Sequence, residues 1–276
     1  MASPETREQG DAHESRQPRT ADRERAGASW RTALAAREPA TRGRADGAGV
    51  WPSDRHNDVF FPPIRSHLLA NGIAVAGLDK RGVGASTGDW LGAGIVEQAD
   101  DVLAALETLS DAPDLAGIPM GIFGRSQGGW VVLEAAARGR GVAFVVTSSG
   151  PGVSPAEQER HAAADGLRRA GHVPSEVEAA LTSYQSMLES IRAGASYQDF
   201  QRALEADAER RRLDRLTQVA FVPDSEAEWN FARLIIDYDP RAAMRRIRCP
   251  VLALFGAEDR SVPIERSICR VPRLAE

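Results

Sequence analysis

Ser126 stands in a pentapeptide, Gly124-Arg125-Ser126-Gln127-Gly128, whose setting predicts a reactive hydroxyl. An apolar run at residues 118–123 precedes the pentapeptide, and a helix-like stretch at residues 130–137 follows it. A serine on a tight turn between a strand and a helix presents its hydroxyl at the helix N-terminus, where backbone N–H groups favour developing negative charge. The flanking glycines leave room for the strand and the helix to approach closely. Ser126 is therefore a candidate nucleophile.

The elements around this turn read as an α/β protein from about residue 47 onward. Short apolar strands are expected at residues 73–78, 118–123, 142–147 and 251–255. Between the first two, apolar residues recur at helical spacing, namely Ile95, Ala99, Val102, Leu106 and Leu109. Continuous apolar strands that alternate with amphipathic helices indicate a mostly parallel sheet covered on both faces.

Residues 151–248 interrupt this alternation and read as a helical cap. Three aromatic residues in the cap, Tyr184, Trp229 and Phe231, either pack in its core or line a substrate pocket. Residues 1–46 contain no Val, Ile, Phe or Tyr and a single leucine, which predicts a disordered or non-native segment. The expected division is thus residues 1–46, a core of residues 47–150 and 249–276, and a cap of residues 151–248.

Composition excludes several classes of function. The net charge of −5 and the pI near 5.7 give no reason to expect nucleic acid as a partner. No apolar run reaches the roughly 20 residues that span a bilayer, and the N-terminus lacks a secretory apolar region. Cys249 and Cys269 are expected to be reduced thiols of a cytoplasmic protein, and no spacing indicates a metal site. Lys80 is the only lysine, and oligomeric state is not indicated.

Four stretches, taken in order, resemble the α/β-hydrolase superfamily over about residues 47–268. Residues 47–51 resemble the glycine-rich oxyanion loop after the third strand, and residues 78–86 the D-x-R-G-x-G-x-S turn after the fourth. Residues 124–128 match the nucleophile elbow, while residues 239–240, 249–252 and 256–259 resemble the end of the cap and the acid-bearing seventh strand. The chain is most similar to prolyl-oligopeptidase-like and dienelactone-hydrolase-like serine hydrolases, a resemblance that implies no cofactor.

The resemblance also implies roles for individual residues. Ser126 would be the nucleophile, and the backbone N–H groups of Gln127 and of the Val50–Trp51 loop would form the oxyanion hole. Asp259 would orient a histidine base, with Glu258 as a competitor and a loop carboxylate that caps the next turn as the structural alternative. Arg81 is expected to hold the turn at residues 78–86 in place.

The chain departs from the superfamily pattern at both ends. Its five histidines, at positions 13, 56, 67, 161 and 172, all precede Asp259. Only 17 residues follow Asp259, too few for a crossover of at least about 10–12 residues, another strand and a histidine loop. Residues 39–46 contain no β-branched residue except Thr41. The third and eighth strands are therefore expected to be missing, and both ends are interpreted as non-native hydrolase sequence.

The sequence thus predicts an α/β-hydrolase fold with a helical cap inserted after the sixth strand. The expected function is a serine hydrolase that cleaves an ester, amide or other acyl bond of a small molecule or peptide through an acyl-enzyme on Ser126. Two alternatives stay open. One is an inactive fragment or pseudo-hydrolase that keeps the scaffold but lacks the base, and the other is an acyltransferase on the same scaffold.

Overall fold

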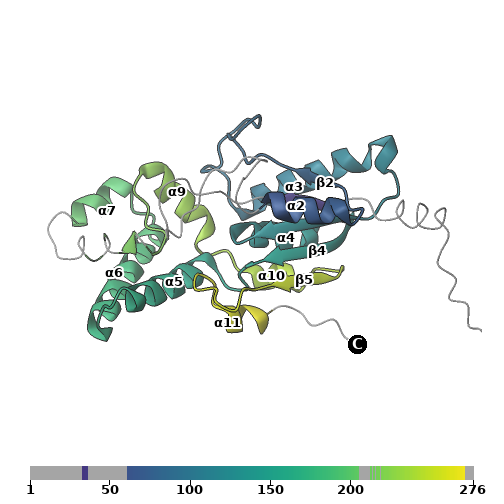
Figure 1. Cartoon of the computed structure of the whole chain (residues 1–276). Helices are drawn as coiled ribbons and strands as arrows, with labels where there is room; N and C mark the ends of the chain where they lie inside the picture. Colours follow the sequence, from purple (N-terminus) through teal and green to yellow (C-terminus); the bar gives the residue numbers. More distant parts are fainter. Residues whose placement is uncertain are drawn as a thin grey trace, which may run out of the picture.

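A parallel sheet forms the centre of the protein. The structure is a computed structural model, and it describes residues 33–36, 61–204, 212, 214, 216, 217 and 219–270. In these residues five strands lie in the order β2-β1-β3-β4-β5, and every adjacent pair is parallel. The strands are β1 (Ala33–Ala36), β2 (Val75–Gly77), β3 (Met120–Arg125), β4 (Val142–Ser148) and β5 (Val251–Leu254) (Figure 1).

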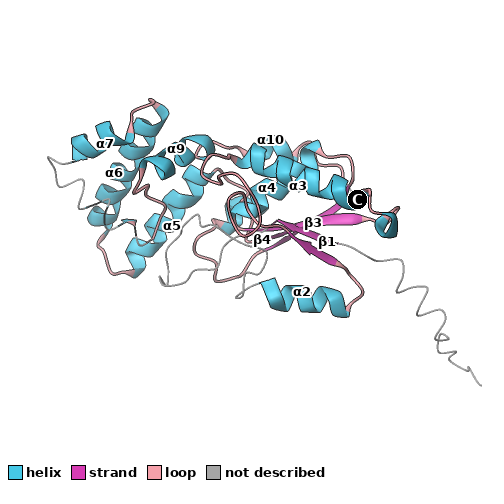
Figure 2. Cartoon of the chain, turned by 90° about the horizontal axis from the view of Figure 1, so that it is seen from above, coloured by secondary structure: helices cyan, strands magenta, loops and turns pink. Residues whose placement is uncertain are grey.

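Helices cover both faces of this sheet (Figure 2). The helix α2 (Phe61–Ala70) lies on one face, whereas α3 (Ile95–Ser110), α4 (Gln127–Arg138) and α10 (Pro240–Met244) lie on the other. A short 3-10 turn, Pro113–Leu115, follows α3, and α11 (Ile264–Ile268) follows β5. The helical pattern predicted from residue 95 is confirmed, because Ile95, Ala99, Val102 and Leu106 are all buried in the core that α3 shares with α4 and the strands.

The third strand, which the sequence predicts to be missing, is present as β1. Its residues pair with β2 on one side and with β3 on the other, so β1 is an interior strand of the sheet. The prediction was wrong because it assumed that the strand would directly precede residue 47 and contain β-branched residues. The strand instead ends about ten residues earlier and has the sequence Ala-Leu-Ala-Ala. Alanine has a low intrinsic preference for strands, so pairing on both sides must stabilise this one. The remaining residues of 1–46 lie outside the described part of the chain.

The end of the sheet agrees with the sequence prediction. Residues 255–270, which follow β5, form a loop and α11 but no further strand. The prediction of a missing eighth strand therefore holds for the described residues. Leu252 and Leu254 of β5 are 54% and 47% exposed, as expected for side chains near the open edge of a sheet.

Helices inserted between β4 and α10 form the cap. They are α5 (Pro155–Arg169), α6 (Pro174–Arg192), α7 (Tyr197–Leu204) and α9 (Glu226–Ile235). These helices share a hydrophobic cluster of their own, in which Trp229 is fully buried and stacks on Phe200 with ring centroids 4.6 Å apart. Tyr184 is also buried in this cluster, whereas Phe231 packs in the core beside the sheet. The domain limits at residues 150 and 248 stay a prediction.

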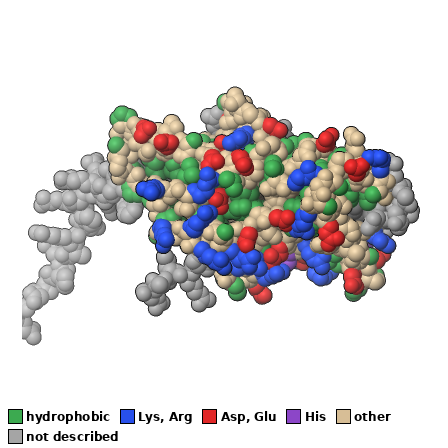
Figure 3. Space-filling view, turned by 180° about the vertical axis from the view of Figure 1, so that it is seen from behind, with side chains coloured by type: hydrophobic (Ala, Val, Ile, Leu, Met, Phe, Trp, Pro, Cys, Tyr) green, Lys and Arg blue, Asp and Glu red, His purple; other side chains and the backbone are tan. Residues whose placement is uncertain are grey.

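The surface carries charges of both signs. On the face shown in Figure 3, basic side chains gather along the lower edge, with acidic side chains among them. Ion pairs such as Arg138–Asp100 at 2.6 Å and Arg192–Asp237 at 2.7 Å show this pairing directly. Within the described residues, none of the helices is both long and apolar enough to cross a membrane.

Candidate active site

Ser126 lies on a sharp turn between β3 and α4, as the sequence predicts. Its backbone has φ of 49° and ψ of −119°, a left-handed region that a residue with a Cβ rarely adopts. Two backbone hydrogen bonds hold the turn. The N–H of Ser126 donates to the carbonyl of Ser148 at 2.9 Å, and the N–H of Gly129 donates to the carbonyl of Ser126 at 2.8 Å. Such strain at a serine points to a functional turn.

Glycines make this turn possible because the chain packs against itself there. A Cβ on Gly124 would lie 2.1 Å from the carbonyl oxygen of Gly128, and one on Gly129 would lie 2.5 Å from the Cα of Gly150. Neither site has room for a side chain, so strand, helix and the loop after β4 meet backbone to backbone. The role of Gly124 was predictable from the pentapeptide motif. The contact between Gly129 and Gly150 was not, because no local sequence pattern indicates that these two residues meet.

Asp259 lies at the same edge of the sheet as Ser126. Ser126 directly follows β3, and Asp259 lies in the loop after β5. Because the strands are parallel, their carboxyl ends lie on the same side of the sheet, and β4 stands between β3 and β5. The Oδ1 atom of Asp259 accepts hydrogen bonds from the backbone N–H groups of Ser261 (3.0 Å) and Val262 (3.1 Å). These contacts cap the following turn, as the structural alternative anticipated. Its competitor Glu258 is exposed and bonded to Arg260.

The structure describes three of the five histidines, at positions 67, 161 and 172. His67 lies in the last turn of α2, which leads into the amino end of β2 and hence the opposite edge of the sheet. His161 is exposed on α5, and the Nδ1 atom of His172 lies 3.0 Å from Glu176. In the described part of the chain, no histidine hydrogen-bonds Ser126 or Asp259. His13 and His56 lie outside that part.

Of the residues predicted to form the oxyanion hole, the structure describes only Gln127. Gln127 is the first residue of α4, and the first N–H groups of a helix have no partner inside it. Its backbone N–H is therefore available for an anion at the N-terminus of α4. The other predicted donors, Val50 and Trp51, lie outside the described residues.

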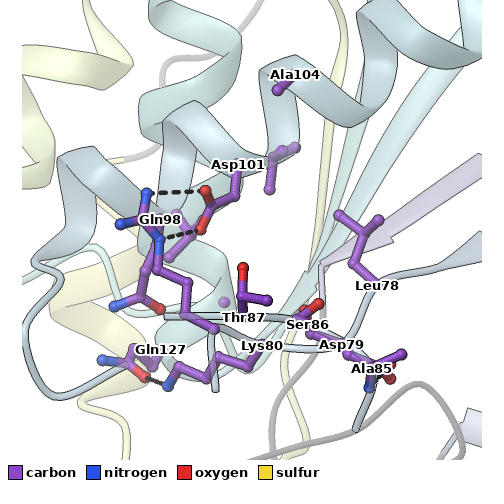
Figure 4. A pocket seen from close by; sticks show the side chains of 14 residues that line it. Leu78, Asp79, Lys80, Ala85, Ser86, Thr87, Gln98, Asp101, Ala104 and Gln127 are labelled. Atoms are coloured by element: carbon purple, nitrogen blue, oxygen red, sulfur yellow. Dashed lines mark hydrogen bonds and ion pairs between the residues drawn. The ribbon is translucent and has the colours of Figure 1, made fainter. Parts of the chain in front are cut away.

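A cavity of about 430 Å³ lies beside the elbow, and sequence reasoning missed it. Gln127 and Gly128 line it from α4, and the turn after β2 and the helix α3 form the opposite walls (Figure 4). The Nζ atom of Lys80 donates to the Oε1 atom of Gln127 at 3.1 Å and lies 4.6 Å from the centre of the Trp90 ring. The only available signal was the single lysine of the chain, placed three residues after the end of β2.

Arg81 holds the turn after β2, as expected. Its guanidinium donates twice to the Asp101 carboxylate, at 2.6 and 2.8 Å, and once to the carbonyl of Glu97 at 3.2 Å. The hydrogen bond to Asp101 raises the pKa of Arg81 above its usual value. This pair fixes the turn on α3 and thereby shapes one wall of the cavity.

The described residues offer no cluster of three or more His, Cys, Asp or Glu side chains that could hold a metal ion. Both cysteines are free thiols; Cys249 is half-buried and Cys269 is exposed. Burial raises the pKa of the Cys249 thiol, which disfavours the reactive thiolate.

A parallel sheet between helices, a strained serine between β3 and α4, and a helical cap after β4 together define an α/β hydrolase. The family model described as serine aminopeptidase, S33, matches residues 56–275, which is most of the chain. The chain therefore belongs to the serine aminopeptidase S33 family and is a hydrolase by family.

Solved structures support the same fold. An esterase from Pyrococcus furiosus is similar with a TM-score of 0.52 and 15% sequence identity, over 88% of this chain and 68% of that chain. DcsB, solved in complex with its substrate analogue, is similar with a TM-score of 0.52 and 13% identity, over 88% of this chain and 77% of that chain. At these identities the likeness concerns the fold alone. A comparison with curated protein sequences gave no match.

Proposed function

We propose that the chain is a serine hydrolase that cleaves an ester, amide or other acyl bond through an acyl-enzyme on Ser126. The observation that carries this proposal is the strained backbone of Ser126 at the N-terminus of α4. A serine held in this way presents its hydroxyl where the helix N-terminus stabilises negative charge. The family description names an aminopeptidase and one similar structure is an esterase, so both amides and esters are substrate candidates.

In the proposed reaction, the Oγ atom of Ser126 attacks the carbonyl carbon of the substrate. The carbonyl oxygen becomes an oxyanion that accepts a hydrogen bond from the backbone N–H of Gln127, with Val50 and Trp51 as further donors. One such donor typically lowers the barrier by about 3 kcal/mol. Collapse of the tetrahedral intermediate expels the alcohol or amine, and water then hydrolyses the acyl-enzyme.

The proton of the Ser126 hydroxyl must pass to a general base. Asp259, which also follows the carboxyl end of a strand, would orient that base, and none of the described histidines hydrogen-bonds Ser126 or Asp259. If no histidine takes this proton, the second candidate applies, namely an inactive scaffold that keeps the elbow but does not turn over. Removal of a triad member leaves residual catalysis in serine proteases, so slow turnover alone does not separate the two candidates.

Labelling by a fluorophosphonate probe tests the proposal, because the reagent reacts with an activated serine. The full chain is first shown to unfold cooperatively on heating and is then incubated with the probe. We expect labelling of the chain, loss of labelling in Ser126→Ala, and unchanged labelling in Ser110→Ala, which removes an exposed hydroxyl at the end of α3. A folded chain that stays unlabelled would support the inactive scaffold instead.

If labelling is seen, the products distinguish hydrolysis from acyl transfer. A short-chain ester is supplied with and without an added alcohol acceptor. Release of free acid only indicates a hydrolase, whereas a new ester in proportion to the acceptor indicates an acyltransferase. An Asp259→Asn variant then tests the acid, because its loss should slow turnover while thermal unfolding changes little.

A further inference from the structure

The side chain of Gln127 combines deep burial with an unused donor. The residue is only 5% exposed, and its Oε1 atom accepts a hydrogen bond from Lys80. Its Nε2 atom, in contrast, has no hydrogen-bond partner and no contact with solvent. A buried donor without a partner is costly and uncommon in native proteins, so each case calls for an explanation.

A bound ligand would explain this donor, because Gln127 lines the cavity beside the elbow. The cavity volume of about 430 Å³ falls within the range of small-molecule sites. Figure 4 shows Gln127 and Lys80 next to each other at one end of it. The terminal torsion of a glutamine is soft, so the amide can turn its Nε2 atom toward an acceptor that enters, and this rotation releases the Lys80 ammonium from Oε1 to donate to the same acceptor.

The charges around the cavity indicate which acceptor fits. Arg81 and Asp101 neutralise each other through their paired hydrogen bonds. The Asp79 carboxylate is turned toward its own loop, where its Oδ2 atom accepts from the N–H of Ala85 at 3.1 Å. The Lys80 ammonium lines the same cavity and donates to the Gln127 amide, so it brings a positively charged donor to this end, and the N-terminus of α4 adds positive potential.

The remaining walls are partly apolar. Leu78 comes from the end of β2, Val102 from α3 and Val131 from α4, and all three line the same cavity. A ligand that fits these walls carries an anionic oxygen at one end and a short hydrocarbon at the other. Hydrogen bonds from charged donors to carboxylates are about twice as strong as those between neutral groups, so a carboxylate is favoured over a neutral carbonyl.

We propose that this cavity binds the carboxylate of a small aliphatic compound. The carboxylate oxygens accept hydrogen bonds from Nε2 of Gln127 and Nζ of Lys80, and the hydrocarbon packs on Leu78, Val102 and Val131. Ser126 itself does not line the cavity but directly precedes Gln127, and under the proposed function the cavity would take a carboxylate-bearing part of the substrate. That catalytic consequence rests on the proposed function, whereas the binding itself does not.

Binding is measured on the full chain carrying Ser126→Ala, which cannot form an acyl-enzyme. Hexanoate is the probe, and hexanamide, which has the same carbon chain without the charge, is its control in isothermal titration. We expect hexanoate to bind about tenfold more tightly than hexanamide. Gln127→Leu and Lys80→Met should each weaken hexanoate binding by about five- to tenfold.

Gln185→Leu is the matched control variant. This glutamine lies on α6, and its Nε2 atom is already bonded to Glu189 at 2.9 Å. The control should bind hexanoate like the parent. Thermal unfolding confirms that the variants fold, and Gln127→Leu should fold well because it removes the unpartnered donor.

Three results would overturn the assignment: equal affinity for hexanoate and hexanamide, no loss of affinity in both cavity variants, or no binding at millimolar hexanoate. Fluorophosphonate labelling of the parent chain, with and without hexanoate, separates this proposal from the catalytic one. Hexanoate binding without any labelling of Ser126 would overturn the serine hydrolase and keep the cavity. Labelling of Ser126 without hexanoate binding would overturn the carboxylate site and support the serine hydrolase.

Discussion

The contact between β3 and α4 at Gly124 predicts a large effect of a single methyl group. In Gly124→Ala, the new Cβ would lie 2.1 Å from the carbonyl oxygen and 2.5 Å from the carbonyl carbon of Gly128, and 2.8 Å from Cγ2 of Val132. Two of these three atoms belong to the backbone and cannot rotate away. The helix α4 would have to move off the strand, although residues 127–136 of it are buried.

The expected cost is at the upper end for overpacking, about 3 kcal/mol. For a chain of this size that loss lowers the midpoint of thermal unfolding by roughly 6–12 °C. Ser126 stands two residues beyond the substitution, and a displacement of about 1 Å of a reacting group can cost on the order of 100-fold in rate. Circular dichroism on heating measures the first effect, and the rate of fluorophosphonate labelling measures the second.

Two other glycines provide controls, because a Cβ on either would meet no atom within 4 Å. Gly141→Ala should stay within about 0.5 kcal/mol of the parent. Gly117 has φ of 76°, so Gly117→Ala isolates backbone strain and should cost about 1–2 kcal/mol. If Gly124→Ala unfolds at the same temperature as Gly141→Ala and reacts at the parent rate, the close contact of β3 with α4 is refuted.

Three further predictions concern packing and charge. Tyr238 donates to the buried carboxylate of Glu134 at 3.0 Å, so Tyr238→Phe should lower the free energy of unfolding by about 1–3 kcal/mol in urea titrations. Trp229 is fully buried in the cap, and Trp229→Ala should cost about 3–5 kcal/mol in the same assay. The Arg241 guanidinium lowers the pKa of Asp239, so the stability from this pair is complete above the ordinary Asp pKa of about 3.9. That contribution is lost as the pH falls through the lower folded value, and Asp239→Asn should unfold with a weaker acid dependence.

Local patterns were enough to find the sharp turn at Ser126 and the class of fold. The pentapeptide around Ser126 lies between an apolar strand and a helix, and all three features are contiguous in the sequence. Each apolar run became a strand because a fully covered parallel strand needs apolar side chains on both faces. The apolar residues that recur at helical spacing from Ile95 onward form the buried face of α3, because one apolar side of a helix packs on the core.

The strand β1 could not be predicted in this way. Ala33–Ala36 has no pattern of its own that favours a strand, and its conformation depends on backbone pairing with β2 and β3. Those partners stand about 40 and 90 residues further along the chain. Such pairing exists only in the assembled sheet, so the intrinsic strand preference of residues 33–36 does not predict it.

The sequence by itself thus determined the position of the elbow, the alternation of strands and helices, and the order of the five histidines before Asp259. The tertiary structure alone decided which side chains surround the elbow. Lys80 reaches Gln127 across 47 residues, and the donor that Gln127 leaves unused becomes visible only once that cavity is formed. Side chains far apart in sequence share no local pattern, because their meeting is set by how the sheet and its helices pack.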